Sequence, residues 1–182
     1  MIELTRESDE EPAVEMIADR AGVSYRSVYR YFDDRTELML AAIARVMGDV
    51  RPIFDIEELG EGRLDGRISR FISSRLDAYR ELAPLTRLAV RRSLTEPVVS
   101  VEFDSIRAFL RAQLVNQFAP ELEHVEASER DLVVTALDVM FQFEALEFLN
   151  RHQGMTDDGM TWVLTRHVHA HLDAAAAAAS TN

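Results

Sequence analysis

Hydrophobic residues recur every three or four positions along most of this 182-residue chain, which is the spacing of one buried helical face. The first such segment carries four of them on one face: Val14, Ile17, Ala18 and Ala21. Gly22 follows directly, and glycine adopts the left-handed backbone of a helix C-terminus at little steric cost. The pattern therefore predicts a helix that ends at Gly22. Strand-like alternation of useful length is missing, so we expect an all-α fold.

A second, shorter helix is predicted directly after this turn. Ser24 can cap its N-terminus, and Val28 and Phe32, four residues apart, are expected to point inward. The other side chains of this helix are expected on its exposed faces: Tyr25, Arg26, Ser27, Tyr29, Arg30 and Tyr31. A short exposed helix rich in Arg, Tyr and Ser after a tight turn suits the major groove of DNA.

Further helices follow from the same spacing. Asp34 and Glu37 resemble a capping box that opens a third helix. Two more are predicted over about residues 64–82 and 85–94, with Pro84 as the break between them.

The C-terminal part of the chain also reads as helical. A helix is predicted over residues 97–114, and two long helices over about 129–151 and 157–178, capped by Ser128 and Thr156. The helix over 129–151 is apolar around much of its circumference, which predicts deep burial or a second face for a partner.

The distribution of charge favours contact with nucleic acid in one short segment only. All 20 basic residues are arginine and the net charge is −12, which argues against nonspecific affinity for nucleic acid. Between Arg20 and Arg35, however, four arginines accompany two acids. The basic region is therefore narrow and coincides with the short exposed helix.

Several classes of protein are disfavoured by what the sequence lacks. The absence of cysteine excludes disulfides and thiolate metal sites. No apolar run approaches the roughly 20 residues that span a bilayer, and no secretory signal is visible, so we expect a cytoplasmic protein without a membrane partner. No catalytic signature is found, so we predict neither enzymatic activity nor a cofactor.

The histidines near the C-terminus raise the question of a metal site. His167 and His171 lie four residues apart, a spacing that can bind zinc. The metalloprotease pattern would need a glutamate between them, where this chain has Val168, His169 and Ala170. We favour a solvated or interface-edge face without a metal. An all-helical enzyme that uses this face is a third functional hypothesis, after the two given below.

A family resemblance rests on motifs in the first quarter of the chain. These motifs are Ile17-Ala18, Ala21-Gly22-Val23-Ser24, Val28-Tyr29-Arg30-Tyr31-Phe32 and Glu37-Leu38. Together they resemble, over about residues 14–42, the DNA-binding signature of TetR-family transcriptional regulators. Beyond them the chain is similar to that family only in length and all-helical pattern.

The resemblance implies an architecture and a function. It implies a helix-turn-helix DNA-binding domain over residues 1–48 and a helical ligand-binding and dimerisation domain over residues 49–182. The expected protein is a ligand-responsive regulator, usually a repressor. It would bind a palindromic operator in double-stranded DNA as a homodimer and be released by a small-molecule inducer.

The same resemblance assigns the DNA contacts. Base edges would be read by Tyr25, Arg26 and Ser27. Phosphates would be contacted by Ser24, Tyr29, Arg30, Tyr31 and Arg35. Two alternatives remain open, because Arg30 can pair with Asp34 instead, and Tyr29 can be partly buried as a core aromatic.

A ligand pocket is expected in the second domain. Its candidate lining residues are Phe71, Arg75, Tyr79, Arg91, Phe103, Phe141, Glu144 and Trp162. An apolar chamber with one or two polar anchors is the usual design, and an inward arginine would favour an acidic or acyl ligand. The alternative for each residue is plain core packing or a solvated arginine. For the dimer interface, which would resemble the family's four-helix interface, the candidates are Met140, Phe148, Leu164 and Val168.

The start of the chain departs from the family pattern. Ile2-Glu3-Leu4 reads as the last turns of a first helix that family members carry in full, often behind a basic arm. This predicts weakened folding and DNA affinity of the first domain. The second functional hypothesis is therefore a ligand- or protein-binding helical module that has lost DNA binding through a truncated N-terminus.

Overall fold

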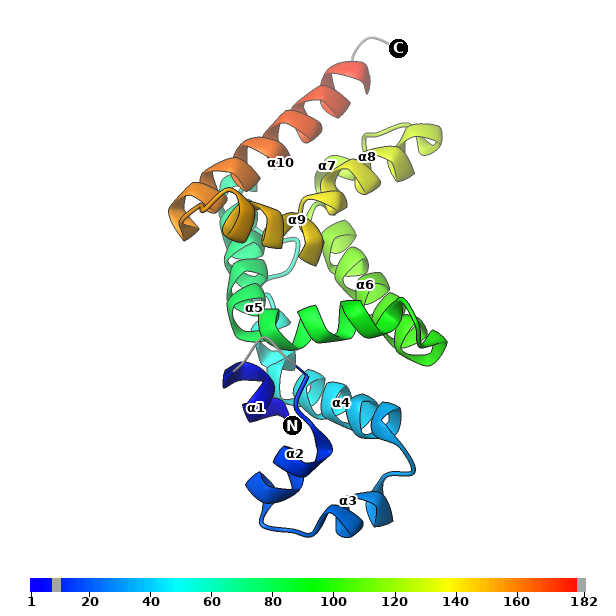
Figure 1. Cartoon of the computed structure of the whole chain (residues 1–182). Helices are drawn as coiled ribbons and strands as arrows, with labels where there is room; N and C mark the ends of the chain where they lie inside the picture. The colour runs from blue at the N-terminus through cyan, green and yellow to red at the C-terminus, as the bar shows by residue number, and fades with distance from the viewer. Residues whose placement is uncertain (8–10, 180–182) are drawn as a thin grey trace. The chain divides into compact units, whose positions relative to one another are not determined.

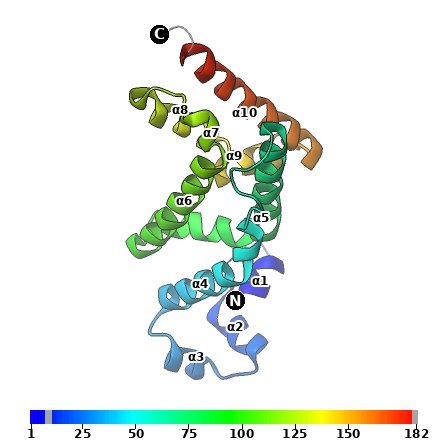
Figure 2. The same ribbon diagram turned by 180° about the vertical axis from the view of Figure 1, so that it is seen from behind.

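The computed structural model describes residues 1–7 and 11–179, with the backbone alone described over residues 46–53. Within this part of the chain every regular element is a helix, which confirms the predicted all-α fold; Figures 1 and 2 show the helices from two sides. In chain order they are α1 (Ile2–Glu7), α2 (Val14–Ala21), α3 (Tyr25–Tyr31), α4 (Arg35–Phe54), α5 (Leu64–Ser93), α6 (Pro97–Gln117), α7 (Ala119–Leu122), α8 (Ala127–Val139), α9 (Phe143–Glu147), the π-helix η1 (Phe148–His152) and α10 (Asp157–Ala179).

The helices pack into two compact units. Unit 1 comprises Met1–Pro52 and Glu81–Ser105, and unit 2 comprises Ile53–Arg80 and Ile106–Asn182. Packing therefore does not follow the boundary expected near residue 48, because the end of α5 and the start of α6 pack in unit 1. The extent of the functional domains stays a prediction.

The turn between α2 and α3 forms as predicted. Gly22 has a φ of 67°, and its N–H donates to the Asp19 carbonyl oxygen at 3.2 Å, which closes the end of α2. Val14 and Ala18 are buried on the inner face of α2. Ala21 was expected beside them and is exposed, because the helix ends at this residue and the chain turns away at Gly22.

α3 is fixed by a cap and an apolar contact. The Ser24 hydroxyl accepts a hydrogen bond from the Ser27 N–H at 3.1 Å, as predicted for an N-cap. Val28 is buried against α2, and Phe32 is partly buried in the same cluster. The opposite faces of α3 are consequently left free of this small core.

α4 begins with the predicted cap. The Asp34 carboxylate accepts a hydrogen bond from the Glu37 N–H at 2.8 Å, and the Glu37 carboxylate accepts one from the Asp33 N–H. Met39 on α4 then packs with Leu88 and Val99 in a second core cluster of unit 1.

The helix break expected at Pro84 is wrong. Pro84 lies inside α5 and does not end it. A proline removes one backbone hydrogen bond, whereas the burial of Leu82, Ala83 and Leu88 favours the helix on both sides of it. Between α6 and α8 the chain also forms the short helix α7, with Pro120 in its first turn.

The single helix predicted over residues 129–151 is in fact α8, α9 and η1. Gln142 has an extended backbone, with φ −68° and ψ 149°, so the helix stops before it and restarts at Phe143. α8 begins at Ala127, so Ser128 is not its cap. Thr156, in contrast, caps α10 as predicted, and its hydroxyl accepts a hydrogen bond from the Gly159 N–H at 3.2 Å.

Candidate nucleic-acid interface

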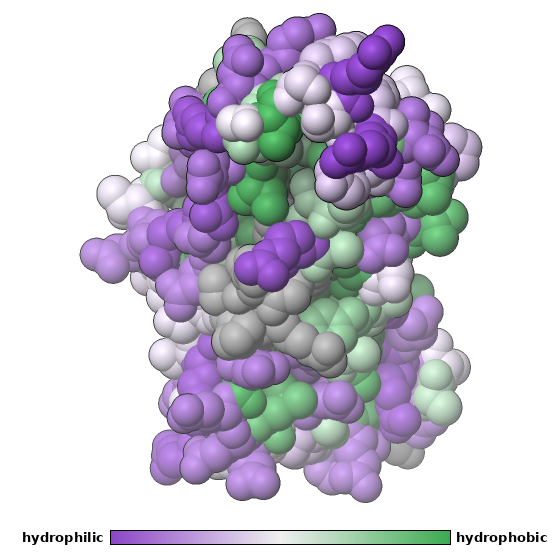
Figure 3. Space-filling model, turned by 90° about the horizontal axis from the view of Figure 1, so that it is seen from below, coloured by the Kyte–Doolittle hydropathy of each residue, from purple (hydrophilic) through white to green (hydrophobic). Residues whose placement is uncertain are grey.

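The outer faces of α3 carry the side chains that the sequence singled out. Tyr25, Tyr29 and Tyr31 are 48%, 37% and 67% exposed, and Arg26 and Arg30 are exposed as well. Ser27, which was also expected on an exposed face of α3, is half-buried, and its hydroxyl lies 2.8 Å from that of Ser24. Figure 3 views the molecule from below relative to Figure 1 and shows mostly hydrophilic side chains on that face, with separate hydrophobic patches between them.

The aromatic side chains of α3 support one another. The rings of Tyr25 and Tyr29 lie 5.0 Å apart, and the hydrogen bond with Tyr29 raises the pKa of Tyr25. The Tyr25 hydroxyl is therefore protonated at neutral pH and can act as a donor. The Arg30 guanidinium lies 5.0 Å from the centre of the Tyr31 ring and donates to its hydroxyl at 3.0 Å. Within the described residues it forms no ion pair with Asp34.

Two of the four arginines of this region are already held by carboxylates. Arg20 forms paired hydrogen bonds to Glu7 at 2.9 and 2.7 Å, and Arg35 donates to Glu11 at 2.7 Å. The hydrogen bond from Arg20 in turn lowers the pKa of Glu7. The cationic character of α3 therefore rests on Arg26 and Arg30. A phosphate contact by Arg35 remains a prediction, and it would compete with Glu11.

Glu11 belongs to a larger network within unit 1. Its carboxylate also accepts hydrogen bonds from Arg92, and Arg92 forms an ion pair with Glu96. The Thr36 hydroxyl donates to the other oxygen of Glu96 at 2.5 Å. The network joins the segment before α2, the start of α4 and the junction of α5 and α6. Sequence reasoning missed it, because its partners lie up to 81 residues apart.

Four of the expected pocket residues are buried together in unit 2: Phe71, Arg75, Tyr79 and Phe141. The guanidinium carbon of Arg75 lies 4.3 Å from the centre of the Phe71 ring, and the Phe71 and Phe141 rings meet edge to face at 4.9 Å. The Tyr79 hydroxyl donates to Glu147 at 2.7 Å. Burial lowers the pKa of Arg75 to about 10.

The other four expected pocket residues lie elsewhere. Arg91 and Phe103 belong to unit 1, and Glu144 is exposed and pairs with Arg107. Trp162 is 67% exposed on α10, because it lies on the side of the helix opposite its buried positions. Four of the eight residues expected in the lining are thus buried together, and their role in a ligand pocket stays a prediction.

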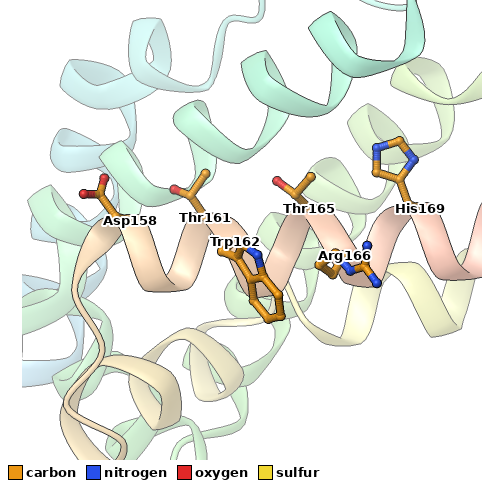
Figure 4. A pocket seen from close by; sticks show the side chains of 6 residues that line it. All are labelled: Asp158, Thr161, Trp162, Thr165, Arg166 and His169. Carbon is orange, nitrogen blue, oxygen red and sulfur yellow. The ribbon is translucent and has the colours of Figure 1, made fainter.

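α10 carries an open surface groove beside this tryptophan. Figure 4 shows Trp162 and Arg166 projecting from a different side of the helix than the remaining lining residues, Asp158, Thr161, Thr165 and His169. The Arg166 guanidinium carbon lies 6.0 Å from the centre of the Trp162 ring. All lining residues come from one helix, so the groove is a surface feature and not a chamber.

Two of the four expected dimer-interface residues cannot contact a partner in this conformation. Leu164 and Val168 are fully buried inside unit 2, because the inner face of α10 packs on the unit's own core. Phe148 is 51% exposed, and Met140 is half-buried. The contact of these two with a partner stays a prediction.

The histidine side chains of α10 make hydrogen bonds and an ion-pair contact within the chain. His167 Nε2 lies 2.9 Å from the Ala136 carbonyl oxygen, and His171 Nδ1 lies 2.9 Å from the His167 carbonyl oxygen. His169 lies 3.2 Å from the Asp65 carboxylate. Among the described residues no group of three or more ligating side chains is arranged to hold a metal ion.

His167 gives a pH-dependent prediction. Burial, and secondarily the neighbouring His171, lower the pKa of His167 below its ordinary value of 6.5. The unfolded chain thus binds this proton more readily, so stability present above about pH 6.5 is lost as the pH falls through the folded-state pKa. We expect His167→Gln to reduce the loss of thermal stability between neutral and acidic pH. The same substitution at the exposed His124 is the control, and an equal effect at both positions would contradict the assignment.

The comparisons with known proteins agree with this geometry. The model of the bacterial regulatory proteins of the tetR family matches residues 11–42, which hold α2, the turn at Gly22, α3 and the start of α4. No curated protein and no solved structure matches the chain. Within the described residues, no helix is long and apolar enough to cross a membrane. Residues 11–42 therefore form a DNA-binding helix-turn-helix of the type that the tetR family of bacterial regulatory proteins carries, which supports a TetR-type DNA-binding regulator.

Proposed function

We propose that this DNA-binding regulator acts as a repressor that binds a palindromic operator as a homodimer and is released by a small-molecule inducer. The observation that carries the proposal is α3, a short helix behind a glycine turn. Its exposed Arg26 has no carboxylate partner among the described residues. An operator-binding repressor would work in the cytoplasm, and the proposal assigns the chain no catalytic role.

The DNA contacts follow from the position of each side chain on α3. Arg26 lies in its first turn, where a guanidinium can donate two hydrogen bonds to guanine. Tyr25 and Ser27 flank it and complete the base-reading set. Phosphate contacts are assigned to Ser24, Tyr29, Arg30, Tyr31 and Arg35.

Exposed apolar side chains of unit 2 support the homodimer. The most exposed large ones are Leu132 and Val139 on α8, Phe148 on η1 and Trp162 on α10. Contiguous exposed apolar surface marks interaction sites, and tryptophan is enriched among residues that dominate binding energy. A second copy of the same unit would bury them by symmetry.

The mechanism requires two spacings of the recognition helices. In the DNA-bound state the two copies of α3 would enter successive major grooves about 34–36 Å apart. A ligand bound in unit 2 would favour another spacing. DNA and ligand would then oppose each other by their difference in affinity for the two states.

Selection from a random double-stranded DNA pool tests the proposal. We expect the purified full chain to enrich a palindromic site with half-sites one helical turn apart, and affinity to fall steeply with salt. Enrichment of a non-palindromic site would contradict the homodimer. Failure to enrich any site would contradict DNA recognition and favour a helical module that binds ligands or proteins.

A further inference from the structure

Arg75 is a buried cation with an unused donor. Its side chain, in the middle of α5, is 3% exposed. Nη2 donates to the Leu110 carbonyl oxygen at 3.2 Å and to Gln113 Oε1 at 3.0 Å, and both acceptors are neutral. Nη1 is buried and has no hydrogen-bond partner among the residues whose side chains the structure describes. An unpaired buried donor is costly, so this one calls for a physical explanation.

Arg67, two turns earlier on the same helix, shows what is missing at Arg75. Arg67 is equally buried, at 3%, and the two oxygens of Glu121 accept paired hydrogen bonds from it. Within the described part of the chain no carboxylate lies within ion-pair distance of Arg75. The charge of the Asp138 carboxylate raises the pKa of Arg75 through space, and this carboxylate accepts a hydrogen bond from Gln142 at 2.8 Å. Burying a charge without a counter-ion is unfavourable, so this position is stable only at a cost.

The surroundings of Arg75 are aromatic and preorganised. Its guanidinium carbon lies 4.3 Å from the centre of the Phe71 ring and 5.9 Å from that of Phe54. Ring faces attract a guanidinium, which offsets part of the cost of burial. The Gln113 amide donates to the Phe54 carbonyl oxygen at 2.7 Å, and this bond turns Gln113 Oε1 toward Arg75. The plane of the guanidinium is therefore held in place before any ligand arrives.

We propose that Arg75 is the anchor of a ligand site for small carboxylates with an aromatic or aliphatic body. The carboxylate would accept the hydrogen bond of Nη1 and supply the missing negative charge, while the phenylalanine rings would contact the apolar body. The planar guanidinium presents paired N–H donors, which match the two oxygens of a carboxylate better than the compact ammonium group of lysine does. The inference rests on the proposed function in one respect, since it names the chemical class of the inducer.

Calorimetric titration of the full chain without DNA tests the anchor. The probes are benzoate, phenylacetate and octanoate, each compared with its neutral amide. We expect at least one carboxylate to bind about tenfold or more tightly than its amide, because only the acid pairs with the cation. Arg75→Gln should abolish this preference, and its circular dichroism spectrum should match that of the wild type, which shows that the variant is folded. Arg75→Lys keeps the positive charge but lacks the planar pair of donors, so it should retain part of the preference for the carboxylate over the amide.

Arg80→Gln is the matched control on the same helix. Arg80 is half-exposed and pairs with Asp77 and Asp157, so its loss should leave the carboxylate preference intact. The proposal is overturned if wild-type protein shows no preference for any of the three acids. It is equally overturned if the preference survives in Arg75→Gln.

A second titration separates this inference from the proposed function. The carboxylate that binds is added to the complex with the selected DNA, and release of DNA is measured. If the carboxylate releases DNA from the wild-type protein but not from Arg75→Gln, both the anchor and the induction mechanism are supported. Binding without release supports the anchor and contradicts induction by this site. Absence of carboxylate binding overturns the anchor and leaves recognition of DNA by α3 untouched.

Discussion

Arg26→Ala is expected to weaken binding to the selected DNA site by at least about thirtyfold and to relax its sequence preference. Loss of a bidentate contact with guanine costs about 1–3 kcal/mol, and a homodimer on a palindrome loses two such contacts, or about 2–6 kcal/mol. Arg26 is exposed and has no hydrogen bond or ion pair among the described residues, so the substitution should not affect folding. Fluorescence anisotropy with the selected site and single-base variants of it measures both effects.

Two further arginines serve as controls for this experiment. Arg30→Ala should weaken binding to all sequences alike and reduce the salt dependence, since Arg30 is assigned to phosphate. Arg63→Ala, at an exposed position in unit 2, should leave DNA affinity unchanged. An unchanged sequence preference in Arg26→Ala would show that this side chain does not read bases.

Glu121→Ala is expected to lower the free energy of unfolding by about 3–5 kcal/mol, because it leaves a buried cation without its counter-ion. Arg67 is buried and also donates to the Gln117 carbonyl oxygen at 2.9 Å and to the Gly62 carbonyl oxygen at 3.2 Å. These bonds hold the guanidinium in the interior, so it cannot turn to solvent when the carboxylate is lost. Urea unfolding followed by circular dichroism gives the change.

An exposed ion pair in the same unit provides the matched comparison. Glu144 pairs with Arg107, and the two side chains are 50% and 40% exposed. Solvent screens such a pair, so Glu144→Ala should cost no more than about 1 kcal/mol. A loss at Glu121 no larger than that at Glu144 would mean that Arg67 reaches solvent or another partner.

The helix-turn-helix could be predicted from sequence because its determinants are local. The left-handed turn at Gly22, the hydroxyl cap at Ser24 and the carboxylate cap at Asp34 each act on backbone groups within three or four residues. The apolar positions Val14 and Val28 meet across one short turn. Residue identity and spacing therefore determine these features almost completely.

The errors arose where a local signal competed with packing. Pro84 normally stops a helix, yet α5 continues through it among buried neighbours. The apolar run over residues 129–151 favours one helix, yet the chain breaks at Gln142. Leu164 and Trp162 illustrate the same limit, because periodicity shows which residues share a face but not whether the unit's own core or a partner covers it.

By itself the sequence determined the all-α fold, the turn between α2 and α3, and the exposed arginines and tyrosines of α3, because bonds and contacts between near neighbours decide them. Only the tertiary structure decided which arginines are free, paired or buried. Arg35 meets Glu11 across 24 residues, and Arg67 meets Glu121 across 54. The same long-range packing buries Arg75 without a counter-ion. Charge pairing between distant segments depends on how helices pack, and no spacing along the chain encodes it.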